Sequence, residues 1–278
     1  MSLTNAEQVA YWNGPMGERW TRQQAAIDRA FAAFTARLLE VASPRPAERV
    51  LDVGCGCGVT TLAAADAVGP AGAVLGVDIS APMLARARER ALGRRNVELL
   101  EDDASTHAFE PSFDVVLSRF GVMFFRDPTA AFANLRTALR PGGRVAVIVW
   151  RPMAENEWAE LPREAAIRHV PAEAPLGPDE PGPFSFGDAA RIERVLGGAG
   201  FTDLVITRFD AEVLFSTEGV DDAVAFAMNA GPTARLLRDA GDDLRERVRG
   251  EVEKTLRPRL EGTRLTLGGS TWLVQARR

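Results

Sequence analysis

Cysteine, lysine, tyrosine and histidine are all scarce in this sequence of 278 residues. The two cysteines, Cys55 and Cys57, are one residue apart, so they cannot join distant parts of the fold, and nothing indicates an oxidising compartment. Lys254 is the single lysine among 33 basic residues, which is most simply the bias of a GC-rich genome. With 38 acidic residues the net charge is −5, so the chain is a poor general binder of nucleic-acid backbones.

Long apolar runs are also missing. None approaches the roughly 18 residues of a membrane span, and the first residues lack the basic start and apolar core of a signal peptide. Hydrophobic residues still make up 46 % and charged residues 26 %, an ordinary globular composition that excludes an intrinsically disordered chain. We therefore expect a soluble, cytoplasmic protein with a sizeable core, no membrane partner and no nucleic-acid partner.

Strand-like and helix-like segments alternate through residues 48–150. The strand-like runs are RVLDV, AVLGVDI, VELLE, FDVVLS and RVAVIVW. Nearly continuous apolar strands separated by helices predict a parallel sheet covered on both faces. Before this region, apolar side chains recur at helical spacing from Ile27 to Val41, and Ser80 and Asp127 stand where helix caps are expected.

The second half of the chain is more mixed. Prolines cluster within 151–186, which predicts an irregular loop with a short helix around 158–167. The run DLVITRF reads as a strand, residues 218–257 as mostly helical, and STWLVQAR as a closing strand.

A glycine-rich stretch, VLDVGCGCG, is the most informative part of the sequence. Asp52 ends a strand, and Gly54, Gly56 and Gly58 alternate before a helix opens. Glycines allow the backbone to turn sharply and approach a ligand closely. Asp78 ends the next strand-like run, where a carboxylate can accept both hydroxyls of a ribose.

Two classes of ligand compete for such a loop. The dinucleotide fingerprint needs Gly or Ala where this chain has Val59. Asp52 would repel a pyrophosphate and attract an ammonium. S-adenosylmethionine (SAM) carries a ribose, an adenine and an ammonium but no phosphate, so SAM is favoured. A nicotinamide-dependent oxidoreductase stays the alternative, and binding of NADH would discriminate between them.

The chain resembles the class I SAM-dependent methyltransferases of the small-molecule, UbiE-like group. The resemblance covers residues 48–150 and rests on LDVGCGCG, GVDIS followed by Met83, EDDA, FDVVLSRFGVMFF and LRPGG. It implies an α/β fold, a Rossmann-like doubly wound seven-stranded mixed sheet with a helical cap. The last strand, 270–277, is expected to run antiparallel at or near the edge of that sheet.

The same resemblance implies how the chain is divided. Residues 1–47 would form an N-terminal helical lid, 48–150 the SAM-binding core and 151–186 a cap insertion. Residues 187–278 would complete the core sheet, with a helical cap insertion at 218–262. Outside the core, YWNG, NEW, PFSF and TWLVQAR are similar to one bacterial subgroup.

Each matching residue then has an implied role in binding SAM. Asp52 and the backbone of the glycine loop would hold the methionine end, with Cys55 as a small filler, and Asp78 would hold the ribose hydroxyls. The remaining implied contacts are Ile79 and Met83 against the ribose and adenine, Asp103 and Ala104 at the adenine edge, the backbone of Ser118 and Arg119 over the ammonium, and Trp20 in a lid over the cofactor.

Aromatic residues near the expected sheet ends are candidates for binding the methyl acceptor, with ordinary core packing as the alternative for each. They are Trp12, Phe124, Trp150, Trp158, Phe184 and Phe186. The stretch FGVMFF stands where nucleic-acid amino-methylating enzymes carry a polar motif, so it suits a small, largely apolar acceptor. Arg119 and Arg126 flank this stretch and would pair with an acidic acceptor or, as we favour, with neighbouring carboxylates.

Methyl transfer is an in-line displacement at the sulfonium methyl that leaves S-adenosylhomocysteine (SAH), and a general base is needed only for an acceptor that carries a proton. Of the two histidines, His107 is expected to be structural, and His169, beside the Pro-rich loop, is the candidate base. No cluster has the spacing of metal ligands, so no metal is expected. A SAM-dependent cyclisation and a non-enzymatic SAM-binding regulator stay open, as does a homodimer.

Overall fold

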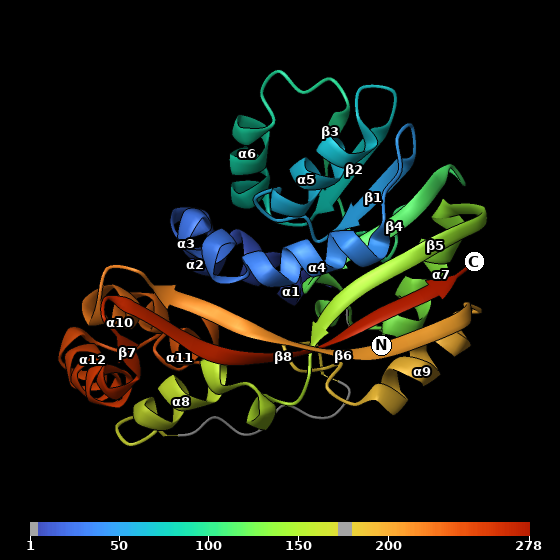
Figure 1. Ribbon diagram of the computed structural model, residues 1–278. Coiled ribbons are helices and arrows are strands. Elements are labelled where there is room, and N and C mark those ends of the chain that lie inside the picture. The colour runs from blue at the N-terminus through green and yellow to red at the C-terminus, as the bar shows by residue number, and fades with distance from the viewer. Residues whose placement is uncertain (1–4, 172–179) are drawn as a thin grey trace.

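Within residues 5–171 and 180–278, which this computed structural model describes, eight strands form one mixed sheet (Figure 1). The strands are β1 (Arg49–Val53), β2 (Ala73–Asp78), β3 (Val97–Glu101), β4 (Phe113–Arg119), β5 (Leu139–Trp150), β6 (Thr202–Ser216), β7 (Leu260–Glu261) and β8 (Arg264–Arg277). Seven of them follow the order β3-β2-β1-β4-β5-β8-β6, and the two-residue β7 pairs with β8. The expected doubly wound mixed sheet is confirmed, with β7 as an additional short strand.

The strand directions also agree with the prediction. β1 to β5 run parallel, and β8 pairs antiparallel with β5 on one side and β6 on the other. β8 is therefore the second strand from the edge, and it begins at Arg264, several residues before the predicted start. The apolar runs of β1 and β4 are buried on both faces, because helices cover both sides of the sheet.

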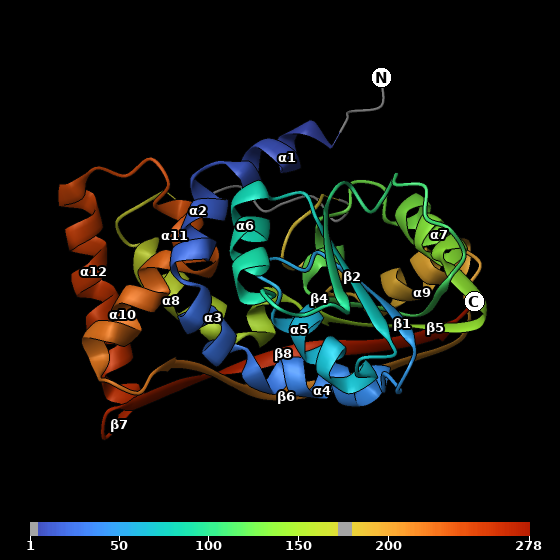
Figure 2. The ribbon, with the colours of Figure 1, turned by 90° about the horizontal axis from the view of Figure 1, so that it is seen from above.

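Two layers of helices enclose the parallel strands (Figures 1 and 2). On one side α4 contacts β4, β5 and α5, and on the other α7 packs against α9. These helices, with α6, are α4 (Ala32–Ala42), α5 (Val59–Val68), α6 (Ala81–Arg90), α7 (Pro128–Ala138) and α9 (Ala189–Gly198). The Asp127 side chain accepts a hydrogen bond from the Ala130 amide at 3.0 Å, so the predicted cap of α7 is confirmed.

The N-terminal region is broken into more pieces than the helical spacing predicts. Its helices are α1 (Ala6–Asn13), α2 (Pro15–Arg22), α3 (Gln24–Ala30) and α4. The expected helix from Ile27 to Val41 is interrupted at Phe31, between α3 and α4. The apolar face is still buried as predicted, because Ile27, Phe34 and Leu38 all lie in the core.

β6 and β8 are unusually long, at 15 and 14 residues, and reach beyond the core sheet toward a group of helices (Figure 1). These are α8 (Glu157–Ala166), α10 (Val220–Asn229), α11 (Gly231–Leu236) and α12 (Asp242–Leu256), with single 3-10 turns at Met153–Glu155 and Arg257–Arg259. α8 contacts α11, α12 and β8, so the helices pack as one cap on the long strand pair. The helical prediction for 218–257 is confirmed. Residues 172–179, within the Pro-rich stretch, lie outside the described residues.

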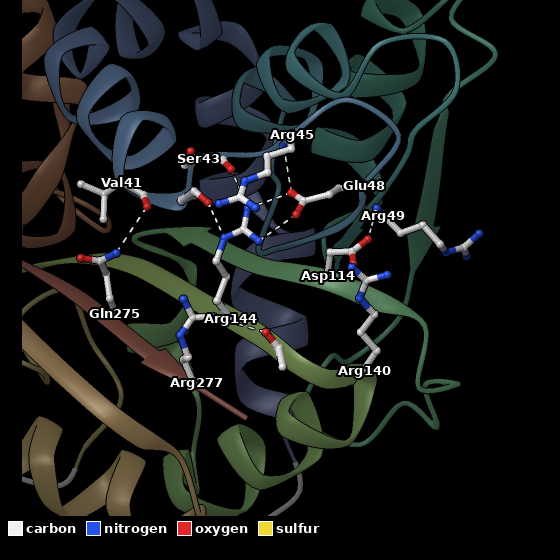
Figure 3. Close-up of polar contacts among 12 residues, drawn as sticks. Val41, Ser43, Arg45, Glu48, Arg49, Asp114, Arg140, Arg144, Gln275 and Arg277 are labelled. Carbon is white, nitrogen blue, oxygen red and sulfur yellow. Dashed lines mark hydrogen bonds and ion pairs between the residues drawn. The ribbon is translucent and has the colours of Figure 1, made fainter.

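A half-buried arginine holds the end of α4 to the sheet (Figure 3). Arg144 of β5 donates two hydrogen bonds to the Glu48 carboxylate, at 2.8 and 2.9 Å, and others to the carbonyls of Ala42 and Ser43. The cluster lies at the amino ends of the parallel strands. Open α/β sheets bind their ligands at the opposite, carboxyl ends, so this cluster is structural. No helix in the described part of the chain is both long and apolar enough to cross a membrane.

Candidate functional site

A pocket opens at the carboxyl ends of β1, β2, β3 and β4. About 1040 Å³ of space not filled by protein atoms lies within it, counting the solvent at its open mouth. Its lining includes Gly54, Cys55, Gly56, Asp78, Ile79, Met83, Asp103, Ala104 and Arg119 from the core, and Trp12, Trp20, Gln24, Ile27 and Asp28 from the N-terminal helices. Residues far apart in the sequence are thus brought to one cavity.

The glycine loop between β1 and α5 needs its glycines for two reasons. Gly54 has a φ of +66°, and a Cβ placed on it would lie 2.7 Å from the Cα of Gly121, which follows β4. Gly56 has a φ of +54°, and its amide donates a hydrogen bond to Oδ2 of Asp78 at 2.8 Å. The loop therefore packs against the β4 end while its backbone lines the pocket.

Asp78 stands at the pocket wall with both carboxylate oxygens held in place. Besides the Gly56 bond to Oδ2, the Ser80 amide donates to Oδ1 at 2.9 Å. Burial raises the pKa of this carboxyl, while the backbone hydrogen bonds oppose that rise. A carboxylate has about four acceptor positions, so each oxygen keeps a lone pair for a further donor. This arrangement fits the two hydroxyls of a ribose.

Asp52 lies behind the loop rather than in the pocket lining. Its side chain is fully buried, and Oδ2 accepts hydrogen bonds from the hydroxyls of Thr60 and Thr61 at 2.6 Å each. Oδ1 has no hydrogen-bond partner among the described residues. Burial raises the pKa of this carboxyl to about 6. An unpartnered buried carboxylate oxygen beneath the loop fits a cationic ligand group nearby, reached directly or through a water.

The third acidic position follows β3. Oδ1 of Asp103 accepts hydrogen bonds from the Ser105 amide and hydroxyl, at 2.9 and 2.7 Å, and Oδ2 accepts one from Nδ2 of Asn5 at 2.8 Å. Asp103 and Ala104 both line the pocket, and their contact with adenine stays a prediction. The neighbouring Asp102 pairs with His107 at 2.7 Å, which lowers the pKa of that carboxyl and gives His107 the structural role expected of it.

Ser118 and Arg119, at the end of β4, have different surroundings. Ser118 is fully buried, and its hydroxyl donates to the Val53 carbonyl at 2.7 Å. Arg119 lines the pocket and donates to Oγ1 of Thr35 at 2.8 Å. Asp28, also in the lining, pairs with Arg90 at 2.8 Å. Arg119 thus brings a positive charge to the end of the pocket near the glycine loop.

The aromatic residues proposed for the acceptor fall into two groups. Trp12, Trp20 and Phe124 line the pocket, and the Trp12 ring lies 5.8 Å from Trp20 and 5.2 Å from Phe124 in edge contact. The other four proposed residues lie outside this lining, namely Trp150, Trp158, Phe184 and Phe186.

Those four residues correct the acceptor prediction. Trp150 stacks on Phe120 at 4.2 Å and lies 4.8 Å from Trp158, because helices from the chain's start and the cap cover that end of β5. Phe186 is buried against Phe132 at 6.1 Å, and Phe184 is partly buried at the edge of the same core. Trp150, Trp158 and Phe186 belong to the hydrophobic core, and Phe184 packs against it.

His169 is also displaced from its expected role. It follows α8 on the exposed surface and is outside the lining of the pocket. Among the described residues, no group of three His, Cys, Asp or Glu side chains is arranged to hold a metal ion.

The structure adds a contact that sequence reasoning missed. The Trp12 carbonyl accepts a hydrogen bond from the Ser80 hydroxyl at 2.7 Å. Asn13 donates to the Ile79 carbonyl at 2.7 Å and accepts from the Ala81 amide at 2.9 Å. These bonds hold α1 and α2 beside α6, where Figure 2 shows them, and so cover the pocket. The motif YWNG was noted in the sequence, but nothing in it indicated the partner.

The N-terminal helices also contribute pocket residues that no sequence motif predicted. Gln24 and Asp28 of α3 line the cavity, and Asn5 reaches Asp103 from the opposite end of the helical segment. The sequence indicated only that these residues belong to a region predicted to form a lid.

Comparisons with known proteins agree with this geometry. Residues 50–143 match a family described as a methyltransferase domain. Aklanonic acid methyltransferase DauC of Streptomyces sp. strain C5 is 37 % identical over 150 residues, which are 51 % of this chain and 68 % of that protein. Nocamycin O-methyltransferase of Saccharothrix syringae is 35 % identical over 196 residues, which are 66 % of this chain and 69 % of that protein.

Solved structures share the fold at low sequence identity. The YcgJ protein from Bacillus subtilis gives a TM-score of 0.58 at 17 % identity, covering 89 % of this chain and 98 % of that one. Phosphoethanolamine N-methyltransferase 2 of Haemonchus contortus, in complex with SAM, gives 0.58 at 18 % identity, covering 99 % of this chain and 60 % of that one. Two curated methyltransferases are 37 % and 35 % identical to this chain over 68 % and 69 % of their own lengths. This chain therefore belongs to the class I SAM-dependent methyltransferase family.

Proposed function

We propose that this chain transfers the methyl group of SAM to a small, largely apolar acceptor. One observation carries the proposal: a single pocket joins a glycine loop and an anchored Asp78 carboxylate to an aromatic wall of Trp12, Trp20 and Phe124. The first part suits a nucleoside with a charged amino-acid tail, and the second suits an apolar body beside it.

Different residues of the pocket would contact the adenine, the ribose and the methionine end of SAM. Asp78 would accept the ribose hydroxyls, and Asp103 with the Ala104 amide would meet the adenine edge. At the other end the Arg119 guanidinium would bind the methionine carboxylate, since Arg is a strong donor to carboxylates. The buried charge of Asp52 would stabilise the ammonium.

The chemistry depends on positioning more than on proton transfer. Bound SAM supplies an electrophilic methyl carbon, and an acceptor lone pair that displaces the sulfur leaves SAH. The aromatic wall would hold the acceptor on the axis of displacement at about 3 Å and exclude water. The acidic residues of the pocket are already engaged, Asp28 with Arg90 and Asp102 with His107. We therefore expect an acceptor atom that is ionised or bears a free lone pair at working pH.

The curated relatives support a small-molecule acceptor. Their names give aklanonic acid for one and an O-methyl transfer in nocamycin for the other. We extend the class of acceptor, a small metabolite, to this chain, and propose SAH as its second product. The atom that receives the methyl group, O, N or C, is left to the assay.

A thermal-unfolding screen with SAM, SAH and NADH tests the cofactor first. A ligand at about 100 times its dissociation constant adds roughly 2.7 kcal/mol of stability. In a chain of this size, that raises the melting midpoint by roughly 5–10 °C. We expect a rise with SAM and SAH but not with NADH, and a rise with NADH alone would overturn the proposal.

The reaction is tested next, with SAM carrying an isotopically labelled methyl group and a panel of aromatic metabolites. Label transferred to a product heavier by one methylene supports methyl transfer. A rearranged product of unchanged mass would instead show a SAM-dependent cyclisation. Tight SAM binding with no SAH released alongside any acceptor in the panel would indicate a regulator.

A further inference from the structure

A second pocket adjoins the first. Asn5, Trp12, Trp20 and Phe124 line both cavities, so the two share an aromatic wall. This second pocket lies where α1 and α2 meet α11 and the residues after β4. It offers the acceptor space beyond the end of SAM, and its chemistry differs from that of the first pocket.

Positive charge collects in this second pocket. Arg126, Arg235 and Arg238 line it, against two carboxylates, Glu7 and Glu180. Within the described residues Arg126 and Arg238 form no ion pair, although many other arginines of the chain do. In a chain with fewer basic than acidic residues overall, such a local excess is informative.

Further arginines lie just behind this wall. Arg19 of α2 donates a hydrogen bond to the Ala234 carbonyl at 3.4 Å. Burial lowers the pKa of Arg19, and repulsion from Arg245, Arg22 and Arg238 lowers it further. Arg19 is thus repelled by neighbouring arginines, and an anion bound nearby would relieve that repulsion.

An aromatic path connects this charge to the first pocket. The Arg238 guanidinium lies 5.3 Å from the centre of the Tyr11 ring, and Tyr11 meets Trp12 at 5.2 Å. From Trp12 the path continues to Trp20 and Phe124 at 5.8 and 5.2 Å. A flat aromatic body laid along these rings would have one end at the arginines and the other near the transferable methyl group.

We propose that the acceptor is an aromatic carboxylate, whose carboxylate is bound by Arg126 and Arg238 while its aromatic body reaches the methyl group. This inference rests on the proposed methyl transfer and names the acceptor's class. The carboxylate acts as a handle that orients the acceptor, and the methylated atom lies elsewhere on the body. Arginine suits this task because its planar guanidinium matches a carboxylate with two parallel hydrogen bonds.

The test compares two probes of nearly the same shape, 2-naphthoate and its neutral counterpart 2-naphthamide. Each is titrated calorimetrically into the full chain saturated with SAH. We expect naphthoate to bind about tenfold more tightly or better, because charge-assisted hydrogen bonds are the stronger ones. The preference should shrink as salt is added, since Arg126 is exposed.

Variants then assign the preference to these residues. In the double variant Arg126→Gln/Arg238→Gln, naphthoate should fall to the affinity of naphthamide, while naphthamide itself is unaffected. The control is Arg95→Gln/Arg247→Gln, which removes the same charge from exposed positions outside both linings and should retain the preference.

Each outcome has one meaning. Equal affinity of the two probes, no measurable binding of either, or a preference that survives in the double variant overturns the inference while the methyl-transfer proposal stands. Failure of the wild-type chain to bind SAH, measured first, removes the proposed function and this inference with it. The variants' own SAH affinity and melting midpoint report whether they are folded.

Discussion

Replacing the buried acid Asp52 with asparagine is predicted to stabilise the free protein at neutral pH. The pKa of this carboxyl is about 6 in the folded protein, against 3.8 for an unperturbed aspartate. The folded state therefore holds the proton more tightly than the unfolded state does. Stability from this group is complete below pH 3.8 and is lost as the pH rises through about 6.

The size of the effect follows from that shift. A difference of about two pKa units corresponds to about 3 kcal/mol at pH 7. Asparagine carries no charge, and its oxygen can still accept the hydroxyls of Thr60 and Thr61. Its amide would stand where Oδ1 has no partner, which costs about 1–2 kcal/mol. The expected net gain at pH 7 is about 1–2 kcal/mol, and it turns into a net loss of about 1 kcal/mol toward pH 4, where only the cost of the amide remains.

SAM affinity should move in the opposite direction. If Asp52 stabilises the ammonium, Asp52→Asn lowers the affinity by about tenfold, because a charge-assisted interaction is lost. Urea unfolding from pH 4 to pH 8 and calorimetric SAM titration measure both effects. Asp66→Asn is the control, since that side chain is 66 % exposed. A variant less stable than the wild type at pH 7, or a gain of equal size at pH 4 and pH 7, would refute the reasoning.

Three further substitutions test other parts of the structure. Asp78→Asn should weaken SAM binding by about 30- to 100-fold, because its amide group would place a donor against backbone amides and the ribose hydroxyls. An unchanged calorimetric affinity would contradict the ribose assignment. Gly54→Ala should cost about 1–3 kcal/mol in urea unfolding. Gly93→Ala, also at a positive φ (+83°) but with open space around it, should cost less, and equal losses would show that the close approach to Gly121 is unimportant. Arg144→Met should cost about 1–3 kcal/mol of stability, because it removes charge-assisted hydrogen bonds to the half-buried Glu48 carboxylate. Calorimetric SAM affinity should stay unchanged, and a weaker affinity would contradict a purely structural role.

The core sheet could be predicted because its signals are local. The central parallel strands β1 and β4 are buried on both faces, so they read as apolar runs, and α7 begins at the Asp127 cap. The pocket was predictable for the same reason, since Gly54 and Gly56 follow β1 directly and Asp78 ends β2.

What escaped prediction depends on contacts between distant segments. Ser80 does stand at the start of α6, but its hydroxyl donates to the Trp12 carbonyl, and Asn13 accepts from the Ala81 amide in its place. Those partners are 68 residues apart in the chain. No local pattern records such a pairing, so the lid could be anticipated as helical but not placed.

The aromatic residues illustrate a related limit of sequence patterns. Trp12 and Trp150 both stand beside the ends of secondary-structure elements, and both were expected at the acceptor. Which of them faces the cavity is decided by the helices that cover β5, and Trp150 is buried beneath Phe31 and Phe34. A tryptophan's position along a strand therefore does not reveal what covers it.

The long pair of β6 and β8 has a consequence for how enzymes of this type can diversify. The chain leaves β6 at Ser216 and rejoins β8 at Leu265, two residues paired across the strands, and the Gly219 amide bonds the Thr263 carbonyl at 2.9 Å just beyond. Because the two ends already meet, a longer, shorter or foreign segment between them adds little loop-closure cost. Residues 217–263 can therefore vary in length at little entropic cost, provided that the helices within them still pack against α8 and β6.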